Sequence, residues 1–433
     1  MKLDLSGVLR EALGNRGITR FYSHQAEAVD LIRRGENVIV MTPTASGKSL
    51  IYNIPVIESI RSDPLTKALY IFPLKGLEQD QVRNLNELYE AVGGTPGRKI
   101  SGKIQLNFAE VYDGDTSAYR RKKIRENMPS VIFTNPDMLH LAINPFHKKW
   151  EAFFRNLRFV VIDEIHTYRG VFGSHVAHVI RRLRRICEFW GSHPQFIAAS
   201  ATIANPAQLA GQLVGVPFSA VSRSGAPQAG KHFLFVNPVE SPYTETTRLF
   251  VHCLRAGLRT IVFTKARKIT ELVYTWAVNY APDLADKISP YRAGFLPKER
   301  REIEKRLFDG ELLGVVSTSA LELGVDIGGL DCCILCGYPG SIASTWQRAG
   351  RVGRHGGESL VALVAIQDAL DQYLMRHPGA FFEKSHEAAV IDPENRSILK
   401  KHIPCASAEV YLREDDRVYD MKKLRPLIEE LVR

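Results

Sequence analysis

A glycine, a lysine and a serine stand in succession at positions 47–49. An apolar run at 38–41 predicts a buried strand before them, and the apolar spacing at 50–60 favours a helix after them. A strand, a tight loop and a helix start are what a phosphate-binding loop requires, because backbone N–H groups and the helix N-terminus hold the anion. Lys48 would then reach the terminal phosphates of a nucleotide, and Ser49 would ligate Mg²⁺. We expect the rest of the loop to be Thr42, Pro43, Thr44, Ala45, Ser46 and Gly47.

This loop departs from the usual pattern, Gly-x-x-x-x-Gly-Lys-Ser/Thr, because Thr42 stands where the first glycine is expected. Short motifs of this kind also arise by chance. The interpretation therefore depends on partners elsewhere in the chain.

Two adjacent carboxylates, Asp163 and Glu164, follow the apolar run 159–162. On its own, an acidic pair after a strand is commonly a solvated turn. Downstream of a phosphate-binding loop, we expect Asp163 to hold Mg²⁺, usually through water, and Glu164 to polarise the water that attacks the γ-phosphate.

Tyr22 and Gln25 come just ahead of the loop, before a helical pattern at 26–32. An aromatic followed by glutamine is well placed to stack on a nucleobase and hydrogen-bond to it. The alternative is an ordinary amphipathic helix with a glutamine on its surface.

Two arginines, Arg351 and Arg354, stand three residues apart in the segment 346–354, where a helix could point both the same way. Across an interdomain cleft they could act as arginine fingers, which stabilise the charge that develops on a transferring phosphoryl group. A basic patch unrelated to the nucleotide is the alternative.

The elements that must position these residues alternate between strands and helices. Strands are expected at 38–41, 68–73, 131–133, 158–162 and 195–202, and again at 233–236, 260–263, 313–317 and 332–335. A segment rich in Gly, Pro, Ser and Ala at 220–232 indicates a domain boundary. We therefore predict an α/β protein with a first domain at 1–222, a second at 223–390, which carries no phosphate-binding loop of its own, and an accessory region at 391–433.

Composition places the chain among globular proteins. It has 433 residues, of which 45% are hydrophobic and 24% charged, so each domain can build a full core. Lys and Arg number 57 against 47 Asp and Glu, a net charge of +10 that suggests a polyanionic partner or serves solubility. Without an export signal or an apolar run of 18 residues, we expect a cytoplasmic protein that does not enter a membrane.

Six cysteines do not form a disulfide framework in a chain of this length, and free thiols suit the cytosol. Cys333 and Cys336 have the spacing of metal ligands, but they lie in what reads as one buried strand, which favours core packing over a metal site.

The expected helix at 176–187 has apolar residues on one side and arginines on the other, at 181, 182, 184 and 185. A solvated face is the simpler interpretation, and contact with a phosphate backbone is the alternative.

Taken together, these segments resemble the ordered motifs of superfamily 2 helicases of the DExH type. The motifs are Gln25, the loop 42–49, Asp-Glu-Ile-His at 163–166, Ser-Ala-Thr at 200–202 and Gln-Arg-Ala-Gly-Arg-Val-Gly-Arg at 347–354. Further segments narrow the resemblance to the bacterial mitomycin-repair-factor helicases, relatives of the fungal RecQ-four-like helicases; these segments are 112–116, 134–140, 167–175, 291–301 and 321–327. The similarity extends from about residue 16 to about residue 410.

This resemblance implies two tandem RecA-like domains with parallel sheets flanked by helices and an ATP cleft between them. It implies an ATP-dependent DNA helicase that uses Mg²⁺, moves 3′ to 5′ on single-stranded DNA or tailed duplex DNA, and serves DNA repair. We expect it to act as a monomer. His166 would couple hydrolysis to movement, Arg351 and Arg354 would face the ATP, Gln347 would contact it, and Gly324 and Asp326 would help to close the cleft. The strand contacts implied are Pro73, Lys75, Thr134, Asn135, Thr264, Arg267, Arg292, Thr318 and Ser319.

One departure concerns the C-terminal region. Members of this family continue into a domain with four metal-binding cysteines, and nothing after Cys405 supplies them. We therefore expect either a fragment that holds the motor or a naturally shortened form. An RNA helicase on the same fold and a clamp that binds ATP as a switch remain alternative functions.

Overall fold

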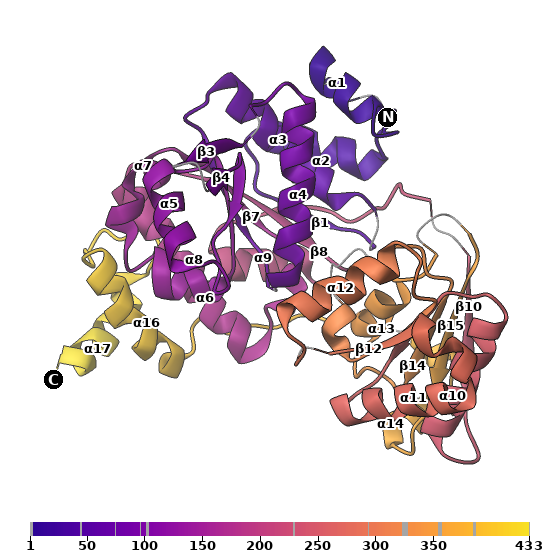
Figure 1. Ribbon diagram of the computed structural model, residues 1–433. Coiled ribbons are helices and arrows are strands. Elements are labelled where there is room, and N and C mark those ends of the chain that lie inside the picture. The colour runs from indigo at the N-terminus through magenta and orange to yellow at the C-terminus, as the bar shows by residue number, and fades with distance from the viewer. Residues whose placement is uncertain are drawn as a thin grey trace. The chain divides into compact units, whose positions relative to one another are not determined.

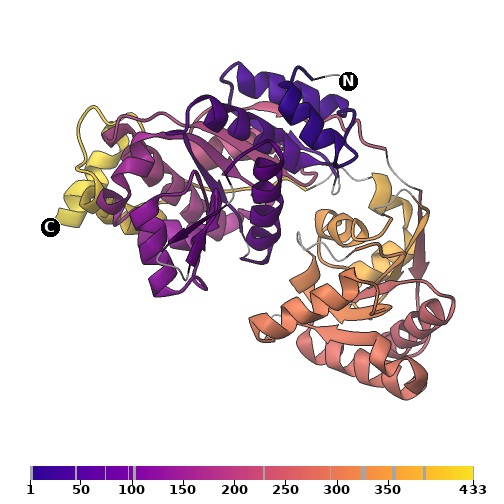
Figure 2. The same cartoon turned by 45° about the horizontal axis from the view of Figure 1, so that its top comes forward.

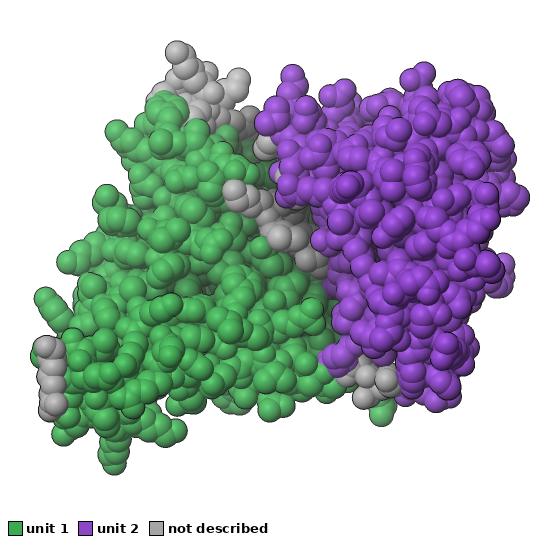
Figure 3. All heavy atoms as spheres, turned by 90° about the horizontal axis from the view of Figure 1, so that it is seen from below, with its two compact units in different colours: residues 1–225, 388–433 green, residues 226–387 purple. Residues whose placement is uncertain are grey.

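The computed structural model describes residues 3–43, 46–73, 75–95, 97–100, 104–227, 230–292, 294–322, 328–353, 357–383 and 387–432. Two compact units divide the chain, and Figure 3 colours them separately. Residues 1–225 together with 388–433 form the first unit, and residues 226–387 form the second. The first unit is therefore discontinuous in sequence.

A parallel sheet of seven strands lies at the centre of the first unit, in the order β5-β6-β2-β7-β8-β1-β9 (Figures 1 and 2). Most of its strands are nearly continuous apolar runs, as expected where helices cover both faces of a parallel sheet. The bounds are β1 Val38–Met41, β2 Lys67–Ile71, β5 Ala109–Val111, β6 Val131–Thr134, β7 Leu157–Ile162, β8 Gln195–Ser200 and β9 Ser219–Val221, with a separate antiparallel pair β3 Arg98–Ile100 and β4 Ile104–Leu106.

The helices of the first unit connect these strands and add a C-terminal pair. They are α1 Gly7–Gly14, α2 Ser23–Arg33, α3 Lys48–Ser62, α4 Lys75–Ala91, α5 Ala118–Asn127, α6 Pro136–Met138, α7 Glu151–Arg155, α8 Gly170–Phe189, α9 Pro206–Val214, α16 Arg396–Glu409 and α17 Met421–Val432. Shorter turns are the π-helical η1 Leu139–Ile143 and the 3-10 turns η2 His147–Trp150 and η3 Ile165–Thr167.

The second unit repeats the plan with a parallel sheet of six strands, in the order β10-β15-β14-β11-β13-β12. Its strands are β10 Lys231–Val236, β11 Thr260–Phe263, β12 Ile288–Tyr291, β13 Gly314–Ser317, β14 Cys332–Cys336 and β15 Ser359–Val364. Its helical elements are α10 Pro242–Arg255, α11 Arg267–Tyr280, η4 Pro282–Lys287, α12 Pro297–Phe308, η5 Ser319–Leu321, α13 Ile342–Ala349, α14 Ala369–Arg376 and α15 Gly379–Glu383.

These two sheets confirm the predicted α/β class. The strands expected at 38–41 and 260–263 are β1 and β11 with the same bounds. Cys333 and Cys336 are buried in β14, which confirms their predicted place in the core. In the described part of the chain, no cluster of His, Cys, Asp or Glu is arranged to hold a metal ion, and no described helix has the length and apolar character to cross a membrane.

The C-terminal segment packs on α8, and Figures 1 and 2 show α16 and α17 in yellow in the first unit. Arg182 Nε donates to Glu409 Oε2 at 2.8 Å, and its Nη2 bonds the other carboxylate oxygen. Arg185 Nε donates to Asp416 Oδ2 at 2.7 Å. Because these two arginine side chains are only 1% and 4% exposed, the interpretation of a solvated or phosphate-facing row is wrong for them.

Histidines surround the same contact. The imidazoles of His175 and His402 approach to 2.9 Å, and His402 also faces His140, His178 and Arg182. Burial, followed by the charges of His178 and Arg182, lowers the pKa of His402 to about 3. Burial and Arg181 lower the pKa of His178 to about 4. Both imidazoles are therefore neutral in the folded protein at neutral pH.

Removing the carboxylate partner should destabilise the first unit. In Glu409→Ala the Arg182 guanidinium stays buried without its counter-charge, which typically costs about 3–5 kcal/mol. Thermal unfolding measures this loss. Glu430→Ala is the control, because Glu430 pairs with Arg396 and Lys400 at the surface, where a pair contributes little to stability. Equal losses in the two variants would contradict the buried-pair assignment.

Acid should loosen the same contact. A folded-state pKa below the unfolded value of about 6.5 means that the unfolded chain binds more protons, so stability falls as pH drops through about 6 toward 4. Each such histidine contributes a slope of at most about 1.4 kcal/mol per pH unit. Denaturant titrations at several pH values measure the slope, and His402→Gln should reduce it. An unchanged slope would show that His402 is not the group that titrates.

Candidate functional site

The phosphate-loop segment forms the C-terminal end of β1, a loop and the first turn of α3. Gly47 has φ 74°, and a Cβ at this position would lie 2.4 Å from the amide nitrogen of Gln25. Only glycine meets both conditions. Thr44 and Ala45, predicted parts of the loop, lie outside the described residues.

Hydrogen bonds hold the described residues of the loop together. The hydroxyls of Thr42 and Ser46 lie 2.6 Å apart, and Ser46 Oγ donates to the carbonyl of Pro43 at 2.8 Å. Lys48 Nζ donates to the carbonyls of Thr42 at 2.7 Å and Pro43 at 3.0 Å. Thr42 therefore braces the loop with a side chain that glycine lacks, and the Lys48 ammonium lies where phosphate oxygens can replace its carbonyl acceptors.

Three residues at the start of α2 hold this loop in place through hydrogen bonds and ring stacking. Gln25 Nε2 donates to Gly47 O at 3.0 Å while its Oε1 accepts from Tyr22 N at 3.0 Å. His24 Nδ1 accepts from Gly225 N at 3.2 Å, so its Nε2 carries the proton and donates to Ser46 O at 3.0 Å. The Tyr22 and His24 rings stack with centroids 5.7 Å apart. Gln25 thus positions the loop, and the nucleobase roles of Tyr22 and Gln25 stay predictions.

The two carboxylates follow β7 as expected. Asp163 Oδ1 accepts from Glu164 N at 2.8 Å, and its Oδ2 accepts from Tyr52 Oη at 3.1 Å. Burial and the charge of Glu164 raise the pKa of Asp163 to about 7, against the opposing effect of Lys48. Burial also lowers the pKa of the Lys48 ammonium, and the two carboxylates counteract it. These charges therefore form one coupled group, in which carboxylates outnumber the lysine.

Glu164 and His166 connect this group to the next strand. Glu164 has φ 49°, the only non-glycine left-handed backbone among the described residues. His166 Nδ1 accepts from Ala201 N at 3.1 Å and lies 3.5 Å from Glu164 Oε2. Because Ala201 follows β8, His166 joins the acidic pair to the predicted Ser-Ala-Thr motif through direct contacts.

In the second unit, Gln347, Arg348 and Arg351 are buried, and both arginines bond Glu322. Arg348 Nε donates to Glu322 Oε2 at 2.9 Å, and Arg351 Nη2 donates to the carbonyl of Glu322 at 2.8 Å. The expected helical placement of the finger arginines is wrong for Arg351, because α13 ends at Ala349 and the chain turns at Gly350. Gly324, Asp326 and Arg354 lie outside the described residues.

The predicted strand contacts of the first unit lie at the C-terminal edge of its sheet. Thr134 ends β6 and Asn135 follows it, and Pro73 lies two residues after β2. Thr134 Oγ1 donates to the carbonyl of Tyr112 at 2.8 Å, while Asn135 Oδ1 accepts from Met138 N at 3.0 Å. The Thr134 side chain thus links β6 to the segment after β5, and the Asn135 side chain caps α6, while their contacts with a nucleic-acid strand stay predictions. The side chain of Lys75 is not among the described ones. Ser49, the expected Mg²⁺ ligand, lies in the first turn of α3 with a half-buried side chain.

In the second unit the predicted strand contacts occupy the corresponding edge. Thr264 and Thr318 follow β11 and β13, Arg267 begins α11, and Arg292 pairs with Glu271 at 2.7 Å. A pocket of about 250 Å³ includes two of the predicted contacts; its lining is Thr264, Lys265, Ser319, Tyr338, Pro339, Gly340 and Arg348.

Comparison with known proteins gives the family. The family model DEAD/DEAH box helicase matches residues 22–209, and the Helicase conserved C-terminal domain matches residues 245–356. A crystal structure of the helicase MrfA bound to DNA and AMPPNP is 47% identical, with a TM-score of 0.91 over 99% of this chain and 60% of that chain. The chain belongs to the superfamily 2 helicase family of MrfA and Hrq1. The uncharacterised ATP-dependent helicase YprA of Bacillus subtilis is 49% identical over 94% of this chain and 54% of its own length.

The chain spans only part of the length of its relatives. It covers 38% of the length of the ATP-dependent helicase HRQ1 of Saccharomyces cerevisiae, with 39% identity over 92% of this chain. Structures of Dbp5 and Mss116 align with TM-scores of 0.67 and 0.70 at 14% and 16% identity, a likeness of fold alone. The two family models and these neighbours confirm the predicted pair of RecA-like parallel-sheet units.

Sequence reasoning missed two residues of the candidate site. Tyr52 lies one turn beyond Lys48 on α3, so the spacing of four residues already puts both on one helix face. His24 adjoins Gln25, but nothing in its sequence context indicates that it bonds both Ser46 and Gly225. Their hydrogen bonds assign them to positioning Asp163 and the loop.

Replacing Lys48 tests the loop. Lys48→Ala removes the ammonium that we expect to reach the terminal phosphates, so steady-state ATP turnover should fall at least about 100-fold. Binding of single-stranded DNA, measured by fluorescence anisotropy, should stay largely intact because Lys48 is not a predicted strand contact. Lys122→Ala, at an exposed lysine of α5, is the control. Turnover within a few-fold of the parent would refute the assignment of this loop.

Proposed function

We propose that this chain is the motor of an ATP-dependent DNA helicase that moves 3′ to 5′ on single-stranded DNA and serves DNA repair. The observation that carries the proposal is that Lys48 at the start of α3 and the acidic pair Asp163 and Glu164 after β7 lie close enough for their charges to act on one another. A clamp that only binds ATP would not need Glu164 beside Asp163. The relative MrfA, whose structure contains DNA and AMPPNP, supports DNA and ATP as the ligands.

Divalent metal fits the donor set of the proposed site. Two adjacent carboxylates share one lysine, and the raised pKa of Asp163, about 7, reflects burial and the neighbouring charge of Glu164. Carboxylate and hydroxyl oxygens are ligands that Mg²⁺ accepts, so Asp163 and Ser49 would hold it. When bound, Mg²⁺ supplies positive charge to the β- and γ-phosphate oxygens.

The side chains of this chain have separate roles in the proposed hydrolysis of ATP. Lys48 stabilises the negative charge of the terminal phosphates, and Glu164 orients the attacking water and accepts its proton. Tyr52 fixes the rotamer of Asp163 through its hydroxyl. His166, bonded to Ala201 and close to Glu164, transmits changes at Glu164 to the loop that follows β8. This contact is the proposed first step that couples hydrolysis to movement.

A phosphate-release assay tests the function. Single-stranded DNA should stimulate steady-state ATP hydrolysis about tenfold or more over the basal rate, and RNA of the same sequence should stimulate less. Glu164→Gln removes the carboxylate with little change of volume, so it should abolish stimulated turnover while DNA binding persists. Equal stimulation by RNA would favour the RNA alternative, and a flat rate with either would favour the clamp.

Unwinding assays address direction separately. A duplex with a 3′ single-stranded tail should be unwound in the presence of ATP, and the same duplex with a 5′ tail should not. Preference for the 5′ tail would reverse the proposed polarity without touching the proposed ATPase site.

A further inference from the structure

A basic pocket lies in the first unit beyond the residues assigned so far. It has a volume of about 280 Å³ and lies among the C-terminal end of β5, helix α5 and the turns η1 and η2. That volume is near the lower limit of ligand pockets, so it suits one small ligand unit. Its principal lining residues are Tyr112, Arg121, Arg125, Phe146 and Lys149.

The three cations of the pocket form no ion pair with the described carboxylates. None of these carboxylates lies within ion-pair distance of Arg121, Arg125 or Lys149. Other cations of α5 are paired: Arg120 contacts Glu110 at 2.6 Å, and Lys122 and Lys123 contact Glu126 at 3.8 and 2.8 Å. The cations of α5 outside the pocket thus have carboxylate partners, and the cations at the pocket keep it positively charged.

Helix spacing makes this arrangement unfavourable without a ligand. Arg121 and Arg125 stand four residues apart on α5, where like charges repel. The Nε atom of Arg121 is buried without a hydrogen-bond partner in the structure. A buried donor is normally satisfied, and a phosphate oxygen is the acceptor that a guanidinium binds best. The pocket therefore has the chemistry of a phosphate site.

Neighbouring contacts fix both guanidinium groups in place. Arg125 Nη1 donates to Tyr112 Oη at 2.6 Å, and Arg121 Nη2 donates to the carbonyl of Gly114 at 2.9 Å. A ligand would meet these donors already oriented, which lowers the entropic cost of binding.

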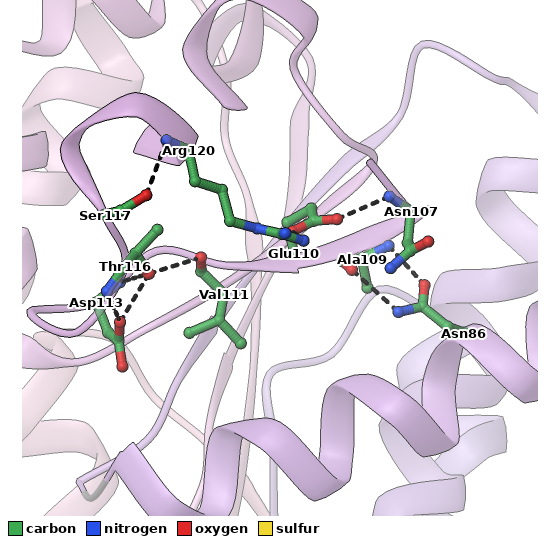
Figure 4. A network of polar contacts seen from close by, with 9 residues as sticks. All are labelled: Asn86, Asn107, Ala109, Glu110, Val111, Asp113, Thr116, Ser117 and Arg120. Carbon is green, nitrogen blue, oxygen red and sulfur yellow. Dashed lines mark hydrogen bonds and ion pairs between the residues drawn. The ribbon is translucent and has the colours of Figure 1, made fainter. Parts of the chain in front are cut away.

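The polar network of Figure 4 anchors the start of α5 to β5. Thr116 Oγ1 bonds Asp113 Oδ1 at 2.7 Å and the carbonyl of Val111 at 3.1 Å, and Ser117 Oγ accepts from Arg120 N at 3.2 Å. The side chain of Glu110 is only 2% exposed and bonds the Arg120 guanidinium. These bonds hold the helix, and with it Arg121 and Arg125, in register with the sheet edge.

An aromatic ring completes the pocket. Phe146 is 50% exposed, and the Lys149 ammonium lies 5.2 Å from its ring centroid. An exposed ring beside unpaired cations is the combination that single-stranded nucleic acid uses, with bases stacked on aromatics and phosphates near positive charge.

The pocket adjoins the proposed path of the strand. Tyr112 lines it, and the carbonyl of Tyr112 accepts the hydrogen bond from Thr134, one of the proposed strand contacts. β5 is the edge strand next to β6, so its C-terminal end is the next position along the same sheet edge. We propose that this pocket binds one nucleotide of the tracked single strand, with its phosphate on Arg121, Arg125 and Lys149 and its base against Phe146. This assignment rests on the proposed function.

Affinity and its salt dependence test the pocket. Arg121→Gln with Arg125→Gln should weaken binding of an oligo-dT of about 20 nucleotides by about tenfold and make the slope of log affinity against log salt shallower by about 1 to 2. Lys122→Gln with Lys123→Gln removes the same charge from the same helix outside the pocket. That control should change affinity less than about twofold.

Two further variants keep the pocket testable if the double arginine variant does not fold. Lys149 is exposed and donates no described hydrogen bond, so Lys149→Gln should fold normally and weaken oligo-dT binding severalfold. Phe146→Ala should weaken binding about fivefold or more without changing the salt slope, because stacking carries no charge. Circular dichroism confirms the fold of each variant.

The outcomes separate this proposal from the proposed function. If the parent binds oligo-dT and hydrolyses ATP but the pocket variants match the control, the pocket assignment fails alone. If the parent binds no oligo-dT, the proposed function fails first and the pocket with it. If the pocket variants lose binding of free thymidine monophosphate while oligo-dT binding is unchanged, the ligand is a free nucleotide and the strand assignment is overturned.

Discussion

The buried negative charge at the end of β7 is the constraint on which the first unit depends. A carboxylate removed from water is unfavourable unless positive charge and hydrogen-bond donors surround it. Here the hydrogen-bond donors are the Tyr52 hydroxyl on α3 and the backbone N–H of Glu164 after β7, and the positive charge is the ammonium of Lys48 at the start of α3. Because β7, β8 and β1 are neighbours in the sheet, their loops meet at one edge and can share this charge.

Some arginines of the first unit have carboxylate partners and serve its structure, and others have no such partner among the described residues and are candidates for ligand binding. Arg182 and Arg185 are buried with carboxylate partners and attach α8 to the C-terminal segment. Arg121 and Arg125 lie at a pocket with no described carboxylate within reach. Arginine therefore stabilises the structure where it forms an ion pair with a carboxylate. Where it forms no such pair, it is a candidate ligand-binding residue.

Sequence predicted the fold class and much of the first site, because these depend on local patterns. Continuous apolar runs predicted β1 and β11, and the acidic pair at 163–164 was expected at the end of a strand, where it follows β7. β5 and β9 have three residues each, too few for a period to be read. Arg182 looked solvated because its partner Glu409 lies 227 residues further along the chain. Helix α13 ends at Ala349, and Gly350 caps it before Arg351. The spacing of the two arginines alone did not predict this helix end.

The discontinuity of the first unit also bears on its synthesis. A ribosome completes residues 1–225 and then the whole of 226–387 before α16 and α17 exist. At roughly 5–20 residues per second, the second unit takes on the order of ten seconds or more to emerge. Throughout that interval the guanidinium groups of Arg182 and Arg185 lack Glu409 and Asp416. The nascent first unit therefore carries an incomplete face on α8 until α16 and the segment after it are translated.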